Sequence, residues 1–167
     1  MLGDDVLLAL GANIAGPWGP PRDTLLRAIG EVAISGVLQI SVSSFYLTEP
    51  VGGIAQPAFV NAVLKGKSQL EPDALIARLH EIEARAGRVR PGIKNGPRTL
   101  DLDILDFGGR VETSGPLTLP HPRLHERAFV LIPLAEIAPG WRHPVLDRFA
   151  ADLLSDLPRK DRDLVRM

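Results

Sequence analysis

The pattern with the clearest chemical potential is a pair of aspartates in an otherwise apolar segment. Residues 98–104 read Arg-Thr-Leu-Asp-Leu-Asp-Ile, so a strand here would present Asp101 and Asp103 on one face and apolar side chains on the other. Two carboxylates about 7 Å apart repel each other unless a cation lies between them. Mg²⁺ typically binds one or two carboxylates together with substrate phosphates. The same alternation also describes a half-exposed strand whose aspartates pair with arginines or face water.

The residues just before this strand form a basic loop, and this context favours the metal interpretation. Between positions 85 and 98 the chain has basic residues and prolines and glycines, but no acidic residue. Arginine forks match phosphate oxygens, so the loop would place phosphate ligands beside metal ligands. The basic residues are Arg85, Arg88, Arg90, Lys94 and Arg98.

Other candidate motifs are weaker. His121 and His125 are four residues apart, but the HExxH pattern of a zinc protease is absent, so the basic segment 121–127 is better explained as a source of phosphate contacts. Gly66-Lys67-Ser68 imitates the end of a P-loop, yet Asn61 occupies the position of the required glycine.

Two further residues have open interpretations. Asn61 lies in a predicted strand, where a buried amide needs partners; it either reads a flat heterocycle or bonds the backbone as a structural amide. Phe129 is either a core residue or a stacking platform for such a ring.

Hydrophobic periodicity predicts the elements that position these residues. Strands are predicted at 6–10, 39–46, 59–65 and 99–107, with a Gly108-Gly109 hairpin turn into 110–112. Helices are predicted from Asp23 or Thr24 onward, from Glu71 or Pro72 to Ala86, around 128–137 and near 147–156. On the second helix, Glu83 lies at the margin of the apolar stripe. The order predicts an α+β sandwich on a mainly antiparallel sheet with helices packed on it.

Composition restricts the function classes. The chain has 167 residues, 45% of them hydrophobic, with 19 Lys+Arg against 20 Asp+Glu, which predicts one globular domain over residues 1–167. The absence of cysteine excludes disulfide and thiolate zinc sites. Near-neutral charge argues against nucleic-acid binding through bulk electrostatics. The acidic start of the chain and the lack of a long apolar run predict a cytoplasmic protein without a membrane partner.

Several short motifs occur in an order and at spacings that resemble one enzyme family. They span 11–14, 44–48, 59–62, 87–90, 96–104 and 119–122. Together they resemble the 6-hydroxymethyl-7,8-dihydropterin pyrophosphokinases of folate biosynthesis, over about residues 6–140. The motif Gly-Pro-Arg-Thr-Leu-Asp-Leu-Asp-Ile at 96–104 is highly specific.

The resemblance implies a ferredoxin-like α+β fold and transfer of the β,γ-diphosphate of ATP to the pterin hydroxymethyl group, with release of AMP. It implies two Mg²⁺ ions bound by Asp101 and Asp103, and it implies that Arg88 and Arg98 act on the phosphates. A monomer that binds ATP and the pterin is expected. The implied pterin-binding residues are Thr48, Val51, Phe59, Asn61 and Phe129. The implied ATP-binding residues are His80, Glu83, Arg90, Lys94, Ile104, Thr118, His121 and Arg127.

Some positions depart from the family pattern. Ala12, Phe59, His80, Asn95 and Pro122 stand where relatives carry serine, tyrosine, glutamine, tryptophan and an aromatic residue, respectively. None of these changes touches the two aspartates or the arginines.

Two alternative functions use the same features. The first is another Mg²⁺-dependent nucleotidyltransferase or phosphotransferase that uses the same two aspartates with a different acceptor, and it would release free diphosphate or ADP instead of AMP. The second is an RNA-binding module with 85–98 as its basic patch. The latter requires exposed aromatic residues on adjacent strands, and aromatic residues make up only 5% of the chain.

Overall fold

A mixed sheet-and-helix domain emerges from the computed structural model, which describes residues 3–50, 55–89, 92 and 95–167. Within these ranges the strands are β1 (Asp4–Ala12), β2 (Val37–Val42), β3 (Tyr46–Thr48), β4 (Phe59–Ser68), β5 (Asp101–Phe107) and β6 (Val165–Arg166). The α-helices are α1 (Pro21–Ser35), α2 (Pro72–Arg85), α3 (Ala128–Ile137) and α4 (Ala150–Ser155), and the short 3₁₀ helices are η1 (Leu124–Glu126) and η2 (Arg159–Arg162).

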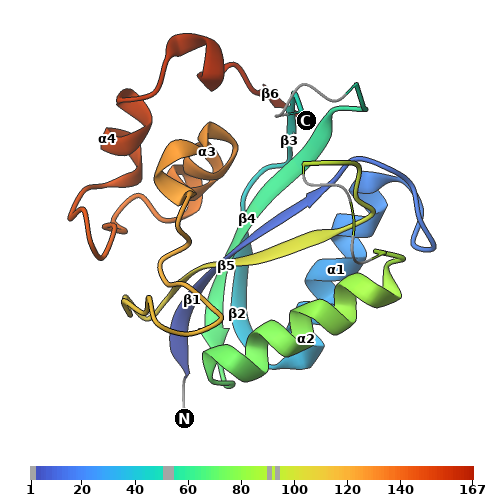
Figure 1. The fold of residues 1–167 in the computed structure, drawn as a ribbon, viewed down its shortest axis with the longest axis horizontal. Coiled ribbons are helices and arrows are strands. Elements are labelled where there is room, and N and C mark those ends of the chain that lie inside the picture. The colour runs from blue at the N-terminus through green and yellow to red at the C-terminus, as the bar shows by residue number, and fades with distance from the viewer. Residues whose placement is uncertain (1–2, 51–54, 90–91, 93–94) are drawn as a thin grey trace.

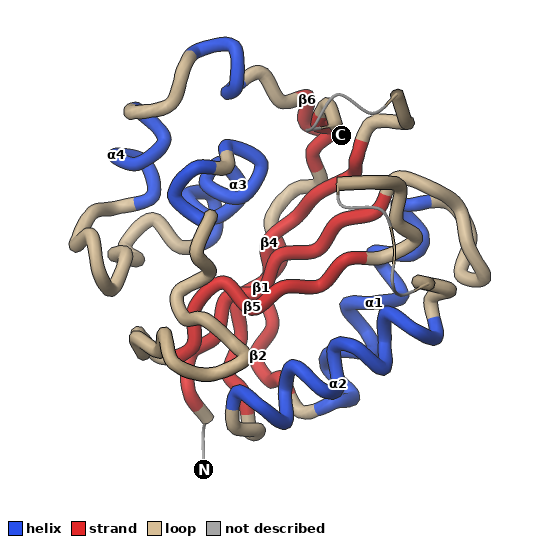
Figure 2. Tube along the Cα trace, in the orientation of Figure 1, coloured by secondary structure: helices blue, strands red, loops and turns tan. Residues whose placement is uncertain are grey.

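The strands form one antiparallel sheet in the order β5-β1-β4-β3-β6, and β2 also pairs with β4 (Figure 2). Because β2 and β3 both run along β4, they act together as one interrupted strand, which gives the β-α-β-β-α-β pattern of a ferredoxin-like fold. The predicted α+β class with a mainly antiparallel sheet is therefore confirmed.

Helices cover both faces of the sheet. Figure 1 shows α1 and α2 on one side and α3 with α4 on the other. The strand period of two explains why both faces are apolar on β1: Val6, Leu8 and Leu10 pack in the core under α1 and α2, whereas Leu7 packs with α3. We call these the α1/α2 face and the α3 face.

The same alternation sorts the side chains of β5. Leu102 and Ile104 lie in the core of the α1/α2 face, and they are 1% and 2% exposed. Asp101 and Asp103 therefore lie on the α3 face, as the sequence pattern predicts. After Ile104 the register between β1 and β5 shifts: Leu8 pairs with Ile104, whereas Leu7 pairs with Asp106. The extra residue, Leu105, forms a β-bulge, which changes the alternation and brings Asp106 onto the α3 face as well.

Several predicted boundaries are wrong. The first helix begins at Pro21 instead of Asp23 or Thr24, since proline suits the first helical position, where no backbone N–H is needed. The strand predicted at 39–46 is two strands. Gln39 adopts a φ of 52°, and the register with β4 shifts between Leu38 and Ser41, so the chain cannot continue as one regular strand.

Two predictions in the second half of the chain also need correction. Gly108-Gly109 does form a turn, closed by the Arg110 N–H bonded to the Phe107 carbonyl at 3.0 Å, but 110–112 does not form a strand with β5. Glu112 instead makes an isolated bridge to Leu119. The last helix is shorter than 147–156, because Asp147 has a φ of 53°, which is incompatible with a right-handed helix. The predictions for α2, α3 and β4 agree with the structure apart from end residues.

Among the residues that the structure describes, no helix combines the length and apolarity required to cross a bilayer.

Two glycines offer a matched test of this packing. A Cβ at Gly66 in β4 would lie 2.9 Å from the Leu38 carbonyl and 2.6 Å from Val37 Cγ1, whereas a Cβ at Gly30 in α1 would meet nothing within 4 Å. We expect Gly66→Ala to lower the free energy of unfolding by about 1–3 kcal/mol through overpacking. Gly30→Ala should raise it by about 0.5–1 kcal/mol, because alanine favours a helix. Urea denaturation measures both, and equal effects would contradict this packing.

Candidate active site

A pocket opens on the α3 face at the start of β5. Its walls come from β1, β3, β4, β5 and the start of α3, which antiparallel pairing and the α3 packing bring together. Eight residues singled out in the sequence line it: Thr48, Phe59, Asn61, Arg98, Asp101, Asp103, Arg127 and Phe129. The structure thus places the two predicted metal ligands and four of the five predicted pterin-binding residues in one pocket.

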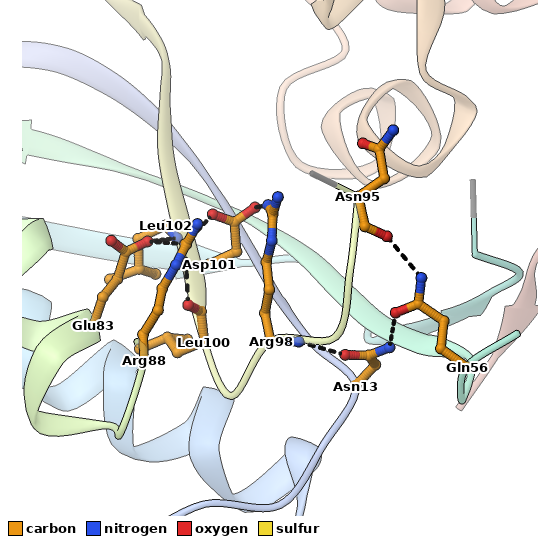
Figure 3. A network of polar contacts seen from close by, with 9 residues as sticks. All are labelled: Asn13, Gln56, Glu83, Arg88, Asn95, Arg98, Leu100, Asp101 and Leu102. Atoms are coloured by element: carbon orange, nitrogen blue, oxygen red, sulfur yellow. Dashed lines mark hydrogen bonds and ion pairs between the residues drawn. The ribbon is translucent and has the colours of Figure 1, made fainter. Parts of the chain in front are cut away.

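The two loop arginines converge on one carboxylate. Arg88 Nη1 donates to Asp101 Oδ1 at 2.6 Å, and Arg98 Nη1 donates to Asp101 Oδ2 at 3.0 Å (Figure 3). The Asp101 side chain is 25% exposed and Arg88 is 12% exposed, so these ion pairs are partly shielded from water. Each oxygen of Asp101 is therefore paired with one arginine. Both arginines would have to move, or share this carboxylate with the ion, before Asp101 could bind a metal.

Glu83 is buried behind this pair, with 1% exposure. Its Oε2 accepts hydrogen bonds from Arg88 Nη1 at 2.8 Å and from the Leu102 backbone N–H at 2.7 Å (Figure 3). Glu83 thus ties α2 to β5 and orients the Arg88 guanidinium toward Asp101. The predicted ATP contact of Glu83 stays a prediction, and in the structure this carboxylate reaches the site through Arg88.

Asp103 has a different electrostatic environment from Asp101. Its loss of hydration, followed by the negative charges of Asp101 and Glu83, raises the pKa of Asp103 to about 7, although Arg127 and Arg88 partly offset this effect. A carboxylate in this setting lacks a sufficient counter-charge. A divalent cation would supply it.

The donor set fits Mg²⁺. Asp101 and Asp103 offer hard oxygen ligands from one face of one strand. Across the described ranges, no group of three or more His, Asp or Glu side chains could hold an ion by itself. Substrate phosphate and water oxygens would therefore complete the coordination, as is usual for Mg²⁺.

Asn61 lies at the other end of the pocket. Its Nδ2 donates to Thr48 Oγ1 at 2.6 Å, and Gly11 lies directly opposite it on β1. A Cβ on residue 11 would be 2.7 Å from Asn61 Oδ1, so only glycine leaves the amide its position. Phe59 and Phe129 also line this end, and the Arg127 guanidinium lies 5.5 Å from the Phe129 ring centroid. An amide and two aromatic rings lining one pocket suit a flat, polar heterocycle.

Other predicted ATP-binding residues do not line the pocket. His80 is exposed on α2, Thr118 is half-buried, and Ile104 is buried on the opposite face of the sheet. His121 lies just outside: burial, followed by the nearby charge of Arg127, lowers its pKa to about 4, and its Nδ1 accepts the Arg123 N–H at 3.1 Å. His121 is therefore neutral, with its proton on Nε2. Val51, Arg90 and Lys94 lie outside the described residues.

A polar network that the sequence analysis did not assign holds the loops around the pocket. Asn13, 3% exposed, donates through Nδ2 to Gln56 Oε1 at 2.9 Å and accepts the Arg98 N–H at 2.8 Å (Figure 3). Gln56 Nε2 donates to the Asn95 carbonyl at 2.7 Å. Asn13 directly follows a buried strand and lies in the motif at 11–14, and these are the two signals that could have found it. Glu49 and Asn95 also line the pocket.

Comparison with known proteins identifies the family. The model of the 7,8-dihydro-6-hydroxymethylpterin-pyrophosphokinase (HPPK) family matches residues 7–139. The chain belongs to this family. It is 40% identical over 154 residues to the 2-amino-4-hydroxy-6-hydroxymethyldihydropteridine pyrophosphokinase of Pseudomonas aeruginosa, covering 92% of this chain and 91% of that protein. It is also 40% identical over 138 residues to the Synechocystis sp. protein of the same name, covering 83% and 68% of the two chains.

Longer HPPK relatives match over part of their length. The folic acid synthesis protein fol1 of Pneumocystis carinii is 40% identical over 140 residues, but the match spans 18% of that protein. Among solved structures, Plasmodium falciparum HPPK-DHPS with pteroate has a TM-score of 0.69 at 13% identity, covering 92% of this chain and 42% of that one. This structural similarity supports the fold described above for the present chain.

The raised pKa of Asp103 predicts a pH-dependent stability of the metal-free enzyme. The ordinary pKa of aspartate is 3.8, so the folded state keeps its proton to higher pH than the unfolded state. The free energy of unfolding should therefore fall as the pH rises from about 4 to about 7. Asp103→Asn removes this penalty, so it should be more stable than the parent at pH 8, by up to about 4 kcal/mol, and similar at pH 4.

Thermal and urea denaturation in EDTA measure this difference. Asp147→Asn is the control, because the Asp147 side chain is 80% exposed. If Asp103→Asn shows the same pH profile as the parent, the electrostatic account of Asp103 is wrong.

Proposed function

We propose that this chain catalyses Mg²⁺-dependent transfer of the β,γ-diphosphate of ATP to the hydroxymethyl group of 6-hydroxymethyl-7,8-dihydropterin, releasing AMP. The observation that carries the proposal is that a single pocket joins an amide-and-aromatic end at Asn61 and Phe129 to a carboxylate-and-arginine end at Asp101 and Arg98. The first end suits a pterin and the second a polyphosphate. The names of the relatives support the pteridine substrate and the pyrophosphokinase reaction.

At the heterocycle end, the protein binds and orients the acceptor. The Asn61 amide is held by Thr48 and presents its oxygen toward the space above Gly11. Phe59 and Phe129 provide ring surfaces for a planar molecule, and stacking and amide pairing together fix its rotation. This orientation would direct the hydroxymethyl group toward β5, where the carboxylates lie.

At the phosphate end, Asp101 and Asp103 would hold two Mg²⁺ ions. Mg²⁺ neutralises charge on phosphate oxygens and aligns the reacting groups. Arg88 and Arg98 now contact the two oxygens of Asp101, and both arginines would leave this carboxylate when Asp101 serves as a metal ligand. Both guanidinium groups would then be free to bind phosphate oxygens, for which their forked geometry is suited.

The transfer itself requires alignment and charge neutralisation more than covalent help from the protein. The hydroxymethyl oxygen attacks the β-phosphorus, the bond from that phosphorus to the α–β bridging oxygen breaks, and the hydroxyl proton passes to water. Arg88 and Arg98 would stabilise the charge that grows on the leaving AMP. The neutral His121, with its Nε2 proton, and Arg127 would bind nucleotide oxygens. Glu83 would act by orienting Arg88.

The proposal extends to the whole chain. We infer a single domain acting as a cytoplasmic monomer, with ATP and the pterin as its partners and no nucleic-acid or membrane partner. Beyond the family match at residues 7–139, β6 pairs with β3, next to Thr48. We infer from this pairing that the last residues support the pterin end of the pocket.

The reaction products provide the direct test. With ATP, 6-hydroxymethyl-7,8-dihydropterin and MgCl₂, the chain should form AMP and the pterin diphosphate in equal amounts. Asp101→Asn and Asp103→Asn should each reduce turnover by about 1000-fold or more while the fold stays intact, because each removes a proposed metal ligand. Release of ADP or free diphosphate, or full activity in EDTA, would contradict the proposal.

Gly11→Ala separates the two ends of the pocket. The added Cβ would press on Asn61 Oδ1, so pterin affinity should fall by about tenfold or more, whereas ATP affinity should change by less than about twofold. Isothermal titration with each ligand alone measures both. Gly30→Ala, remote from the pocket, serves as the control. Equal losses for ATP and the pterin would show that residue 11 affects the fold and not specifically the heterocycle end.

A further inference from the structure

A second pocket lies at the opposite end of the α3 face. Its cavity volume is about 410 Å³, within the usual range for small-molecule sites. It shares no lining residue with the first pocket. Between them, α3 packs on the middle of the sheet, over Val63 and Leu7. The two pockets are therefore separate, and the second has no role in the proposed diphosphate transfer.

The strand register determines which side chains lie next to one another at the base of this pocket. Leu7 on β1 pairs with Asp106 on β5 and with Lys65 on β4, and all three residues line the cavity. They form one row across three strands: an acid, an apolar residue and a base. Neighbouring strands are about 4.8 Å apart, so the ends of the row are separated by about 10 Å at the backbone. Trp141 and Ala138, which follow α3, add apolar surface beside the row.

The acidic end of the row is incompletely satisfied. Asp106 is 7% exposed, and its Oδ2 accepts the Trp141 Nε1–H at 3.1 Å. Its Oδ1 is buried, and the nearby backbone N–H groups of Phe107 and Gly109 stabilise the carboxylate only in part. Among the residues that the structure describes, Asp106 forms no ion pair, so the carboxylate lining this cavity has no counter-charge. Burial also raises the pKa of Asp106, as expected for an acid without a nearby cation.

The basic end of the row contains a lysine that has no ion-pair partner among the described residues. Two lysines line the pocket, and they differ in their partners. Lys67 is paired with Asp5 across β1 and β4. Lys65 is exposed and forms no ion pair within the described residues, since Leu7 separates it from Asp106. One cation in this pocket is therefore neutralised by the protein, and the other is available to an anion.

We propose that this second pocket binds a small, elongated zwitterion, with an amine at one end, an apolar middle and an acid at the other. The amine would supply the counter-charge that Asp106 lacks. The acid would pair with Lys65. The apolar middle would lie against Trp141 and Ala138, beside the part of Leu7 that lines the cavity. A ligand with only one of the two charges would leave one end of the row unsatisfied.

Tryptophan fluorescence provides a direct test. The chain has two tryptophans, so Trp18→Phe leaves Trp141 as the only reporter. The probe is 4-(aminomethyl)benzoate, a zwitterion with a flat apolar ring. Its matched controls are benzylamine, which lacks the acid, and 4-methylbenzoate, which lacks the amine. We expect a saturable change in Trp141 fluorescence with the zwitterion and binding at least about tenfold weaker with either control.

Variants assign the two contacts. Lys65→Met and Asp106→Asn should each weaken binding of the zwitterion by about tenfold or more. Lys67→Met is the matched control and should change binding by less than about threefold, because Asp5 already neutralises Lys67. Asp106→Asn keeps an oxygen for the Trp141 N–H, so its fold should be retained, and its melting curve checks this. Lys65→Met should not alter diphosphate transfer.

Three results would overturn the proposal. The first is no fluorescence change and no heat of binding up to about 10 mM zwitterion. The second is equal binding of the three probes, which would indicate an unspecific apolar surface. The third is displacement of the zwitterion by ATP or the pterin, which would place it in the first pocket. Because the first pocket is tested separately by AMP release, failure of either proposal leaves the other intact.

Discussion

Repulsion between the carboxylates at the start of β5 is the constraint on which the site depends. Asp101 and Asp103 lie on one face of one strand, and Glu83 adds a third carboxylate from behind. The protein compensates Asp101 with two arginines, one at each oxygen, and leaves Asp103 with a raised pKa. The arginines thus supply at Asp101 the positive charge that the proposed metal ion would bring, and both guanidinium groups lie next to the proposed phosphate site.

This arrangement requires that the loop before β5 be held from several sides. Glu83 holds Arg88 from α2, and Asn13 holds the Arg98 backbone from the end of β1. Gln56 joins Asn13 to the Asn95 carbonyl, so the loops after β1, β3 and α2 meet in one hydrogen-bonded network. A substrate that displaced any one of these segments would disturb the hydrogen bonds that join it to the other two. The three loops are therefore joined by amide side chains that contact neither Asp101 nor Asp103.

The α3 face shows how one sheet surface can carry two different sites. Helix α3 covers the middle, where Leu7, Val63 and Leu105 are apolar, and leaves both ends open. At one end the pocket ends at Asp101 and Asp103, and at the other the bulge at Leu105 brings Asp106 to the same face. Without this bulge, Asp106 would point toward the α1/α2 core, where a carboxylate would be strongly unfavourable. The bulge thus explains how a third aspartate is accommodated in β5.

The sequence by itself determined the features that follow from short-range periodicity. The alternation in 98–104 placed both aspartates on one face, the apolar stripe of α2 gave that helix nearly its full extent, and the motifs indicated the family. Tertiary structure alone decided the rest. The split of β2 from β3, the burial of Glu83 and the Asn13–Gln56 hydrogen bond depend on register shifts and on partners 19 to 43 residues away. A local pattern predicts which face a side chain occupies; only the folded chain decides which distant group meets it there, because that contact is set by the packing of several elements at once.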